Sequence, residues 1–220
     1  MKTFLSIGAG PGMGLATAER FARAGFRIVL SARDAGKIRE LAEQLGAGGH
    51  TAEVRTVDAS DPTSVAALIA EVEGAFGSVD VLHYNAAAMR QATLADQPRE
   101  TFNADLAVNI GGAMAAAQAV APKMAERGGG SILLTGGGFG LQPHPDYLSL
   151  SIGKAGIRAL ALGLFESFRD QGIHVATVTV AGFVRPGSED ARAVAERFWQ
   201  LHDQPAGAWE VEAVYTPRVV

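Results

Sequence analysis

The chain has 220 residues, with 19 lysines and arginines against 23 aspartates and glutamates and a formal net charge of −4 at pH 7. This length suits one domain with a sizeable core, and we expect a single domain over residues 1–220. The charge balance argues against nucleic acid or an anionic membrane surface as a partner. The absence of cysteine excludes disulfides, thiolate catalysis and cysteine-based metal sites.

Strand-like and helix-like segments alternate along the chain. In chain order, apolar runs predict strands over 3–7, 27–31, 52–58, 79–84, 131–136, 174–182 and 209–215. Helical spacing predicts helices over 13–24, 36–45, 98–127, 149–170 and 188–202, and Asp61 with Pro62 marks the start of another. This alternation predicts a doubly wound α/β fold, with a mostly parallel seven-stranded sheet and helices on both faces.

No segment is expected to cross a membrane. The apolar run at the N-terminus is too short for a signal peptide and fits a first strand better. Arg158 interrupts the most apolar region, which argues against a bilayer-spanning helix there. A chain without cysteine suits a reducing compartment, and we expect a cytoplasmic protein.

A glycine-rich loop, "SIGAGPGMGLATAERFA" (6–22), joins the first predicted strand to the first helix. Phosphate approaches a backbone closely only where no Cβ intrudes, and a helix N-terminus offers free N–H groups and a positive potential. The strand before the loop and the helix after it are the context in which such a loop binds a dinucleotide. The residues expected to face the pyrophosphate are Gly8, Gly10, Gly12, Met13 and Gly14.

The end of the second strand, "VLSARD", indicates which dinucleotide binds. Sites for NAD usually carry an acidic residue here, but this chain has Ala32 followed by Arg33. A guanidinium can pair with a 2′-phosphate, and the Ser31 hydroxyl can donate a hydrogen bond to it. The sequence therefore favours NADP over NAD, although Asp34 next to Arg33 could weaken the preference.

Together, these features resemble the short-chain dehydrogenase/reductase family over almost the whole chain. The resemblance implies a Rossmann-like, three-layer α/β/α domain that binds NADP(H) and transfers hydride to or from a small-molecule substrate. It rests on the glycine loop, "VDASD", "YNAA", "AVNIGG", the lysine before Ala155-Gly156, and Ala-Gly after the sixth strand. It assigns cofactor contacts to Asp58, Ala59, Asn85, Ala86, Lys154, Ala181 and Gly182, and a supporting role beside the lysine to Asn109.

The catalytic pattern departs from that family. A tyrosine acid and a serine that orients the substrate carbonyl are implied at positions 150 and 137, where this chain has Leu150 and Gly137. One interpretation is relocation, because Tyr147 lies seven residues before Lys154, the spacing that enoyl-thioester reductases of the family use. Tyr147, Lys154 and Asn109 then form the catalytic group, and the chain reduces a carbonyl or an activated alkene.

The other interpretation is loss of chemistry, which would leave an NADP-binding sensor or an assembly subunit. His144 and Asp146 flank the site but are expected to form a rigid turn, and His83 is expected to be a buried histidine with its hydrogen bonds satisfied. A dehalogenase relative is disfavoured, because such proteins lack the glycine loop and the lysine. No metal site is predicted. By analogy with the family, the long helices over 98–127 and 149–170 predict a homodimer or homotetramer.

Overall fold

The computed structural model describes residues 1–217, which form a seven-stranded, wholly parallel sheet in the order β3-β2-β1-β4-β5-β6-β7. The strands are β1 (Thr3–Ile7), β2 (Arg27–Ala32), β3 (Ala52–Thr56), β4 (Val81–Tyr84), β5 (Gly130–Gly137), β6 (Ile173–Val180) and β7 (Glu212–Tyr215). The predicted fold class is confirmed, and every predicted strand is found with shifts of a few residues at its ends.

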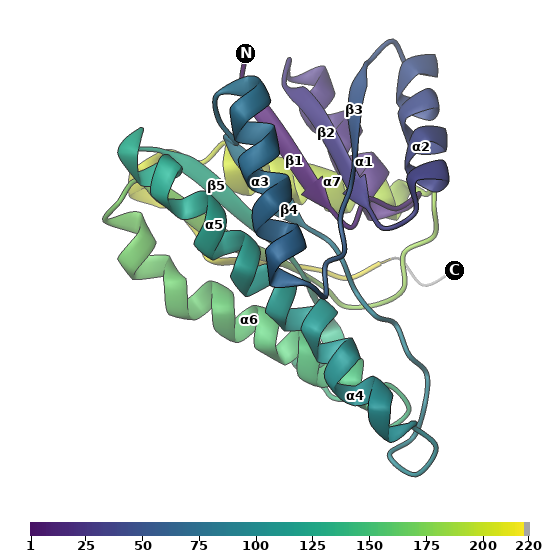
Figure 1. The fold of residues 1–220 in the computed structure, drawn as a ribbon. Coiled ribbons are helices and arrows are strands. Elements are labelled where there is room, and N and C mark those ends of the chain that lie inside the picture. Colours follow the sequence, from purple (N-terminus) through teal and green to yellow (C-terminus); the bar gives the residue numbers. More distant parts are fainter. Residues whose placement is uncertain (218–220) are drawn as a thin grey trace.

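Helices cover both faces of the sheet (Figure 1). One layer contains α3 (Pro62–Phe76), α5 (Gly112–Glu126) and α6 (Leu148–Arg169), and the other contains α1 (Met13–Arg23), α2 (Ala35–Ala47) and α7 (Glu189–His202). Because parallel strands need crossover connections, these layers bury both faces of the central strands. All residues of β1, β4 and β6 are buried, including the polar side chains of Ser6, His83 and Thr177, as expected for central strands that helices cover on both faces.

The predicted helix start at Asp61 and Pro62 is confirmed. The Asp61 side chain accepts a hydrogen bond from the backbone N–H of Thr63 at 2.9 Å, and Pro62 is the first helical residue of α3. Proline suits this position because its missing N–H would have no partner inside the helix.

The helix predicted over 98–127 is interrupted. It consists of α4 (Arg99–Leu106), a π-helical turn η1 (Ala107–Gly111) and α5. The Tyr84 hydroxyl donates to the carbonyl of Val108, and Gly112 lies so close to the sheet that an added Cβ would be 2.2 Å from the oxygen of Ala59. These contacts from β4 and the loop after β3 account for the irregular turn, which sequence periodicity does not reveal.

Two helical segments, Arg99–Glu126 and Leu148–Arg169, are long and apolar enough to cross a membrane by length and composition. The expectation that Arg158 excludes this is therefore wrong on that criterion. A core helix of a globular domain passes the same test, and here one face of each segment packs against the sheet or the adjoining helices. The guanidinium of Arg158 forms a 2.9 Å ion pair with Glu212 of β7.

Candidate functional site

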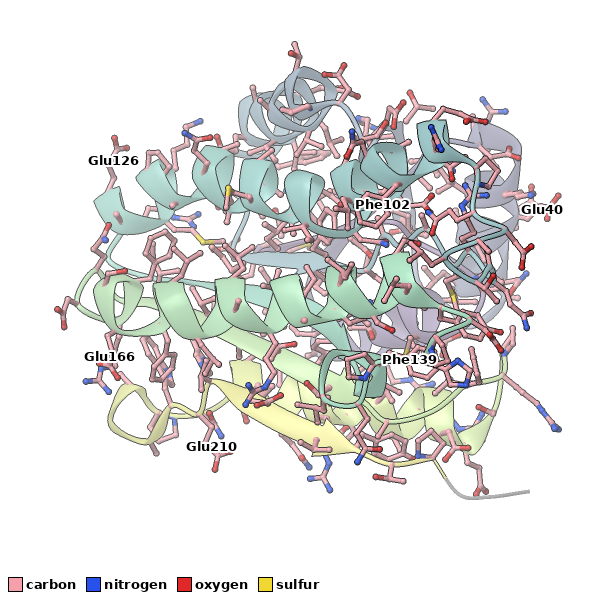
Figure 2. All side chains as sticks on the ribbon, turned by 90° about the horizontal axis from the view of Figure 1, so that it is seen from below. Glu40, Phe102, Glu126, Phe139, Glu166 and Glu210 are labelled. Carbon is pink, nitrogen blue, oxygen red and sulfur yellow. The ribbon has the colours of Figure 1, made fainter. Side chains whose placement is uncertain are left out.

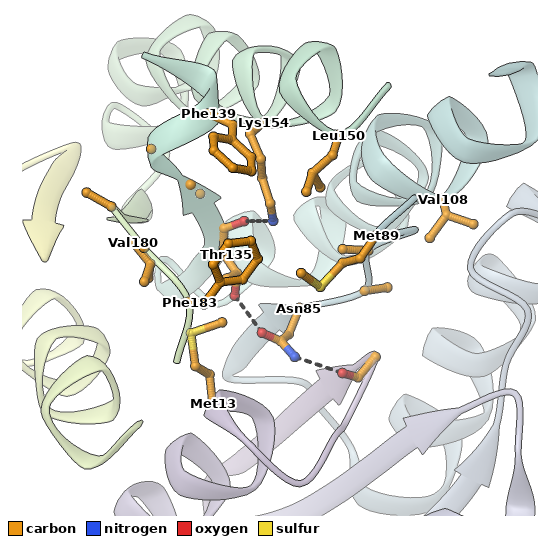
Figure 3. A pocket seen from close by; sticks show the side chains of 18 of the residues that line it. Met13, Asn85, Met89, Val108, Thr135, Phe139, Leu150, Lys154, Val180 and Phe183 are labelled. Carbon is orange, nitrogen blue, oxygen red and sulfur yellow. Dashed lines mark hydrogen bonds between the residues drawn. The ribbon is translucent and has the colours of Figure 1, made fainter. Parts of the chain in front are cut away.

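A cavity of about 810 Å³ opens at the carboxyl ends of the strands (Figure 3). Its walls come from the glycine loop, from the segments that follow β2, β3, β4, β5 and β6, and from the first turns of α6. The strand order reverses direction between β1 and β4, and such switch points are where open α/β sheets bind ligands.

The glycine loop is held against the sheet by its backbone. The N–H groups of Gly8 and Ala9 donate to the carbonyl of Ser31 at 2.8 and 2.9 Å. Gly8 has a φ of +83°, and a Cβ added there would lie 2.3 Å from the backbone nitrogen of Ala86. By contrast, a Cβ at Gly10 would meet nothing within 4 Å, so protein packing does not explain glycine at this position.

The glycine loop and the start of α1 fit the phosphates of a dinucleotide. The first helix, α1, begins at Met13, and Gly12 at its N-cap makes no side-chain hydrogen bond to the helix. The N-terminal amides therefore have no capping side chain and are suited to a phosphate. Gly8 and Met13 line the cavity; Gly14 packs at the back of the loop, where a Cβ would lie 3.2 Å from both Ala9 Cα and Asn85 Nδ2.

A buried hydrogen-bond chain supports the loop from β4 and β5. Asn85 Nδ2 donates to the Gly8 carbonyl at 2.9 Å, and Asn85 Oδ1 accepts from the Thr135 hydroxyl at 3.0 Å (Figure 3). Because that hydroxyl proton is used, Thr135 Oγ accepts from His83 Nε2, 3.3 Å away, and His83 Nδ1 faces the hydroxyl of Ser6 at 3.2 Å. Burial lowers the pKa of His83 to about 3, so its ring is neutral. The prediction of a satisfied buried histidine is confirmed.

Arg33 and Ala32 line one end of the cavity. Arg33 makes no hydrogen bond or close ion pair with any residue in 1–217. Asp34 does not compete for it, because the Asp34 carboxylate caps α2 and accepts from the N–H groups of Gly36 and Lys37 at 3.0 and 3.1 Å. The expected phosphate contact of Ser31 is wrong, since its fully buried hydroxyl donates to the Ser6 carbonyl at 2.8 Å.

The turn after β3 contributes Val57 and Ala59 to the cavity wall, whereas the exposed side chain of Asp58 is not part of that wall. Asp58 Oδ1 accepts from the hydroxyl and the N–H of Ser60, and these bonds, helped by the charge of Arg33, lower the pKa of Asp58. Asp58 therefore shapes the turn, and Val57 is a wall residue that the sequence analysis missed.

Lys154 lies at the other end of the cavity. Its ammonium donates to the Thr135 carbonyl at 2.7 Å, and burial lowers its pKa to about 8. Its aliphatic stem passes over Gly137, where a Cβ would lie 3.1 Å from Lys154 Cγ. Leu150 lines the same region (Figure 3), so neither position 137 nor 150 presents a polar side-chain group to the cavity. Ala181 and Gly182 form the opposite wall, where the chain leaves β6.

Asn109 is buried in η1 beside the start of α6. A Cβ on Gly153 would lie 2.5 Å from Asn109 Cβ, which brings η1 against the residue before Lys154. The Asn109 side chain accepts from the Ala88 N–H at 2.7 Å and donates to the Ala88 carbonyl at 3.3 Å. Its side chain thus holds the loop after β4, which carries the wall residues Ala86, Ala87 and Met89. Whether it supports Lys154 through water stays a prediction.

Tyr147 is the N-cap residue of α6, so the helix begins directly after it, as a relocated tyrosine requires. Its ring packs on Phe139, His144 and Phe183, with centroid separations of 5.3, 5.6 and 6.0 Å. Those three residues line the cavity and Tyr147 does not. The geometry does not favour Tyr147 as the group that contacts substrate, and it brings His144 to the wall instead.

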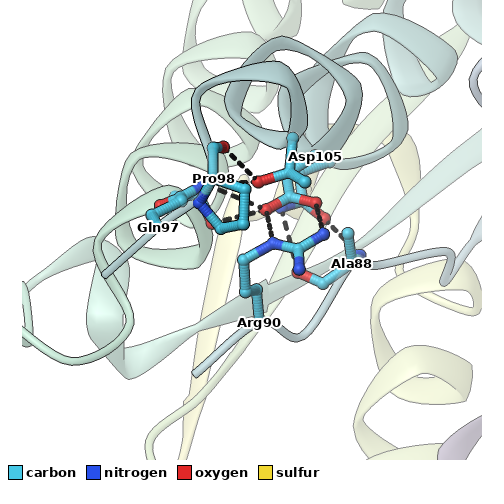
Figure 4. A network of polar contacts seen from close by, with 8 residues as sticks. Ala88, Arg90, Gln97, Pro98 and Asp105 are labelled. Carbon is cyan, nitrogen blue, oxygen red and sulfur yellow. Dashed lines mark hydrogen bonds and ion pairs between the residues drawn. The ribbon is translucent and has the colours of Figure 1, made fainter. Parts of the chain in front are cut away.

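A polar network closes the loop after β4 onto two helices (Figure 4). Buried Asp105 of α4 accepts from Arg90 Nε and Nη2 at 2.8 and 3.0 Å, from Gln97 at 3.3 Å, and from the Ser149 hydroxyl of α6 at 2.9 Å. Because Arg90 follows Met89, this network positions part of the cavity wall. No sequence motif pointed to it.

Solved structures resemble this chain over nearly its full length. A metagenomic short-chain oxidoreductase in complex with NADP matches it with a TM-score of 0.90 and 27% identity over 99% of this chain and 98% of that one. The short-chain dehydrogenase from Rhodopseudomonas palustris matches with a TM-score of 0.89 and 25% identity, covering 99% of each chain.

Two curated relatives are similar in sequence. L-rhamnose 1-dehydrogenase (NAD(P)(+)) of Azotobacter vinelandii is 39% identical over 137 residues, which are 60% of this chain and 54% of that protein, so this match spans about half of the relative's length. Oxidoreductase UcpA of Salmonella typhimurium is 31% identical over 185 residues, 84% of this chain and 70% of that protein. The family model for short chain dehydrogenases matches residues 2–194. This chain therefore belongs to the short chain dehydrogenase family of oxidoreductases.

Proposed function

We propose that this protein is an NADP(H)-dependent oxidoreductase that reduces a carbonyl or an activated alkene of a small-molecule substrate. The observation that carries the proposal is the cavity with Arg33 at one end and Lys154 at the other. The ends of β2 and β5 are separated by three strand steps, or about 14–15 Å at about 4.8 Å per step. That span suits an extended dinucleotide.

Each part of the cavity has a binding role in this proposal. The glycine loop and the N-terminus of α1 bind the pyrophosphate, and Val57 and Ala59 contact the adenine. Lys154 binds the ribose next to the nicotinamide, and Ala181 and Gly182 face the ring. The cofactor supplies the hydride, and the protein supplies orientation and a site shielded from water.

The preference for NADP rests on Arg33. A guanidinium that makes no hydrogen bond or close ion pair within residues 1–217 can form charge-assisted hydrogen bonds with a 2′-phosphate. The carboxylate of the adjoining Asp34 is engaged at the start of α2, and that of Asp58, which feels the charge of Arg33, accepts hydrogen bonds from Ser60. The relative with a bound NADP supports the same choice. Titrating the protein with NADPH and NADH, followed by cofactor fluorescence, tests this proposal. We expect NADPH to bind more tightly, and equal affinities would refute the role of Arg33.

A second function, an NADP-binding sensor or assembly subunit without turnover, is favoured by one specific observation. Gly137 and Leu150 leave the wall without the usual hydroxyl groups, and Tyr147 does not line it. The two functions differ in a direct assay. A panel of aldehydes, ketones and enones mixed with NADPH distinguishes them, because a sensor binds the cofactor but oxidises none of it above the rate without protein.

We further propose that the chain is a cytoplasmic homodimer or homotetramer. The helices α5 and α6 run side by side (Figure 2), and Met114, Ile152 and Leu162 expose apolar side chains on them. Covering this surface with a second copy would remove apolar area from water. Light scattering coupled to size-exclusion chromatography tests it, and a monomer at micromolar concentration would refute it.

A further inference from the structure

We propose that Lys154 is itself the proton donor of the reaction, in place of the tyrosine that is absent from position 150. The inference rests on the proposed oxidoreductase function. It assigns to one side chain two tasks, holding the cofactor ribose and protonating the substrate oxygen. The main evidence is the position of the ammonium, which lies in the cavity between Gly137 and Leu150, where the family's usual hydroxyl groups are absent.

Few side chains in this cavity can exchange a proton. Among the described residues that line it, the ionisable ones are Arg33, His144 and Lys154, and none carries a carboxylate. Arg33 follows β2, three strands away from β5, and a guanidinium does not release its proton in a protein. The choice at the end that would receive the substrate is therefore between His144 and Lys154.

The ammonium has unused hydrogen-bonding capacity. An ammonium has three N–H donors, and the described contacts use one of them, on the Thr135 carbonyl. Leu150 precedes Lys154 by four residues, so both side chains lie on one face of α6. Position 150 carries an alkyl group and position 137 is glycine, and the hydroxyl of the lining residue Thr135 donates to Asn85 rather than to Lys154. The remaining donors are free to meet a ribose hydroxyl and a substrate oxygen.

Among residues 1–217, no carboxylate is paired with the Lys154 ammonium, whose pKa is shifted by burial alone. The cavity wall around it is uncharged. It consists of Thr135, Gly136 and Gly137 from β5, Val108 from η1 and Val180 from β6. On α6 itself, the nearest charged group is Arg158, which is paired with Glu212. His144 is the other titratable group that lines this end of the cavity. Burial without a counter-charge lowers the pKa of Lys154 to about 8, which brings proton release into the working range of an enzyme.

His144 fits the role less well. Its Nδ1 accepts from the N–H of Asp146 at 3.2 Å, so the neutral ring carries its proton on Nε2. Donating that proton would leave an imidazolate, and protonating Nδ1 first would set its N–H against the N–H of Asp146. Tyr147 does not line the cavity. Substituting each of these residues tests whether it supplies the proton in place of Lys154.

With NADPH bound, the cofactor would supply a hydride to the electrophilic carbon of the substrate, and the π-electron pair of the carbonyl would move to its oxygen. An N–H bond of the Lys154 ammonium breaks, an O–H bond forms on the substrate, and the electron pair stays on Nζ. The neutral amine then regains a proton from solvent. Reduction should therefore slow as the pH rises through about 8, where Lys154 loses its proton.

The experiment compares Lys154→Arg with His144→Asn and Tyr147→Phe in the full chain. Arginine keeps the positive charge and can still bind ribose, but it cannot give up a proton. We expect Lys154→Arg to bind NADPH within a few-fold of the parent and to lose turnover by roughly 100-fold or more. The control, Lys37→Arg on α2 and outside the cavity lining, should keep turnover within a few-fold. Retained turnover in Lys154→Arg, or a loss in His144→Asn or Tyr147→Phe as large as in Lys154→Arg, would overturn the proposal.

A readout independent of activity is the titration of Lys154 itself. The rate of reductive methylation of its amine, followed against pH by peptide mass analysis, should have a midpoint near 8 and should fall when NADPH is added. A midpoint near the ordinary value of 10.5 refutes the proton donor while leaving the oxidoreductase proposal intact. NADPH binding without turnover of any substrate by the parent refutes both.

Discussion

Replacing Gly8 with alanine tests how closely the glycine loop must approach the sheet. Gly8 has a φ of +83°, and an added Cβ would lie 2.3 and 2.4 Å from the nitrogen and Cα of Ala86. Backbone cannot move away as the end of a flexible side chain can, so either the loop or the strand end must shift. The chain offers a matched control in Gly25, which has a φ of +84° but nothing within 4 Å of the added Cβ.

The two variants separate two costs. A left-handed backbone costs an L-residue about 1–2 kcal/mol, and this applies equally to Gly8→Ala and Gly25→Ala. Overpacking costs about a further 1–3 kcal/mol and applies only at Gly8. We therefore expect Gly25→Ala to lower the free energy of unfolding by about 1–2 kcal/mol and Gly8→Ala by about 2–5 kcal/mol. Gly10→Ala, whose Cβ also meets nothing within 4 Å, should leave stability nearly unchanged while weakening NADPH binding.

Urea unfolding at equal protein concentration, without cofactor, measures these differences. The reasoning is refuted if Gly8→Ala and Gly25→Ala are equally destabilised, because the close contact with Ala86 would then contribute nothing. If Gly10→Ala binds NADPH as the parent does, the space beside Gly10 does not receive the phosphate.

Arg33→Ala should weaken NADPH binding roughly 10- to 100-fold and leave NADH binding unchanged, since a hydrogen bond to a charged group is worth about 1.5–3 kcal/mol; Arg39→Ala, on the exposed side of α2, is the control for lost charge. Asp105→Asn should lower the free energy of unfolding by about 1.5–3 kcal/mol, because Arg90 and two other donors lose a buried carboxylate; a change below 0.5 kcal/mol would count against the network. Burial lowers the pKa of His83 in the folded protein to about 3, below its usual 6.5. The unfolded chain therefore binds a proton that the folded protein does not, and the free energy of unfolding falls by about 1.4 kcal/mol per pH unit as the pH drops from 6.5 towards 3. His83→Gln should remove that part of the slope from pH-dependent unfolding curves, and an unaltered slope would assign it to His174 and His202, whose pKa values are also lowered by burial.

Much of the cofactor site could be predicted because its signals are local. The glycine loop lies between a strand and a helix that adjoin it in sequence, and its spacing depends on the space that Cβ atoms would occupy. Asn85 and Lys154 were identified in the same way, through short motifs at the end of a strand and on a helix. The preference for NADP came from one residue, Arg33, which the structure brings to the cavity.

Other site assignments were wrong or remain untested because the direction in which a side chain points depends on residues far away in the sequence. Ser31 and Arg33 are two residues apart, yet the Ser31 side chain is buried under the loop, whereas Arg33 follows the end of the strand and reaches the cavity. Tyr147 has the spacing of a relocated acid, but aromatic packing against Phe139 and Phe183 directs its ring. The interruption at η1 arises from contacts with Tyr84 and Ala59, which lie more than 20 residues away in sequence.

The sequence by itself determined the fold class, the family and the place of the phosphate-binding loop, because alternation of apolar runs and glycine spacing act through neighbouring residues. Only the tertiary structure decided which side chains face the cavity. In the structure the Ser31 hydroxyl is buried on the Ser6 carbonyl, and the Asp34 carboxylate caps α2 instead of pairing with Arg33. Leu150 lines the cavity, and the Lys154 ammonium donates to the Thr135 carbonyl. Those outcomes depend on packing between strands and helices far apart in the chain, where burial and hydrogen bonding outweigh local preference.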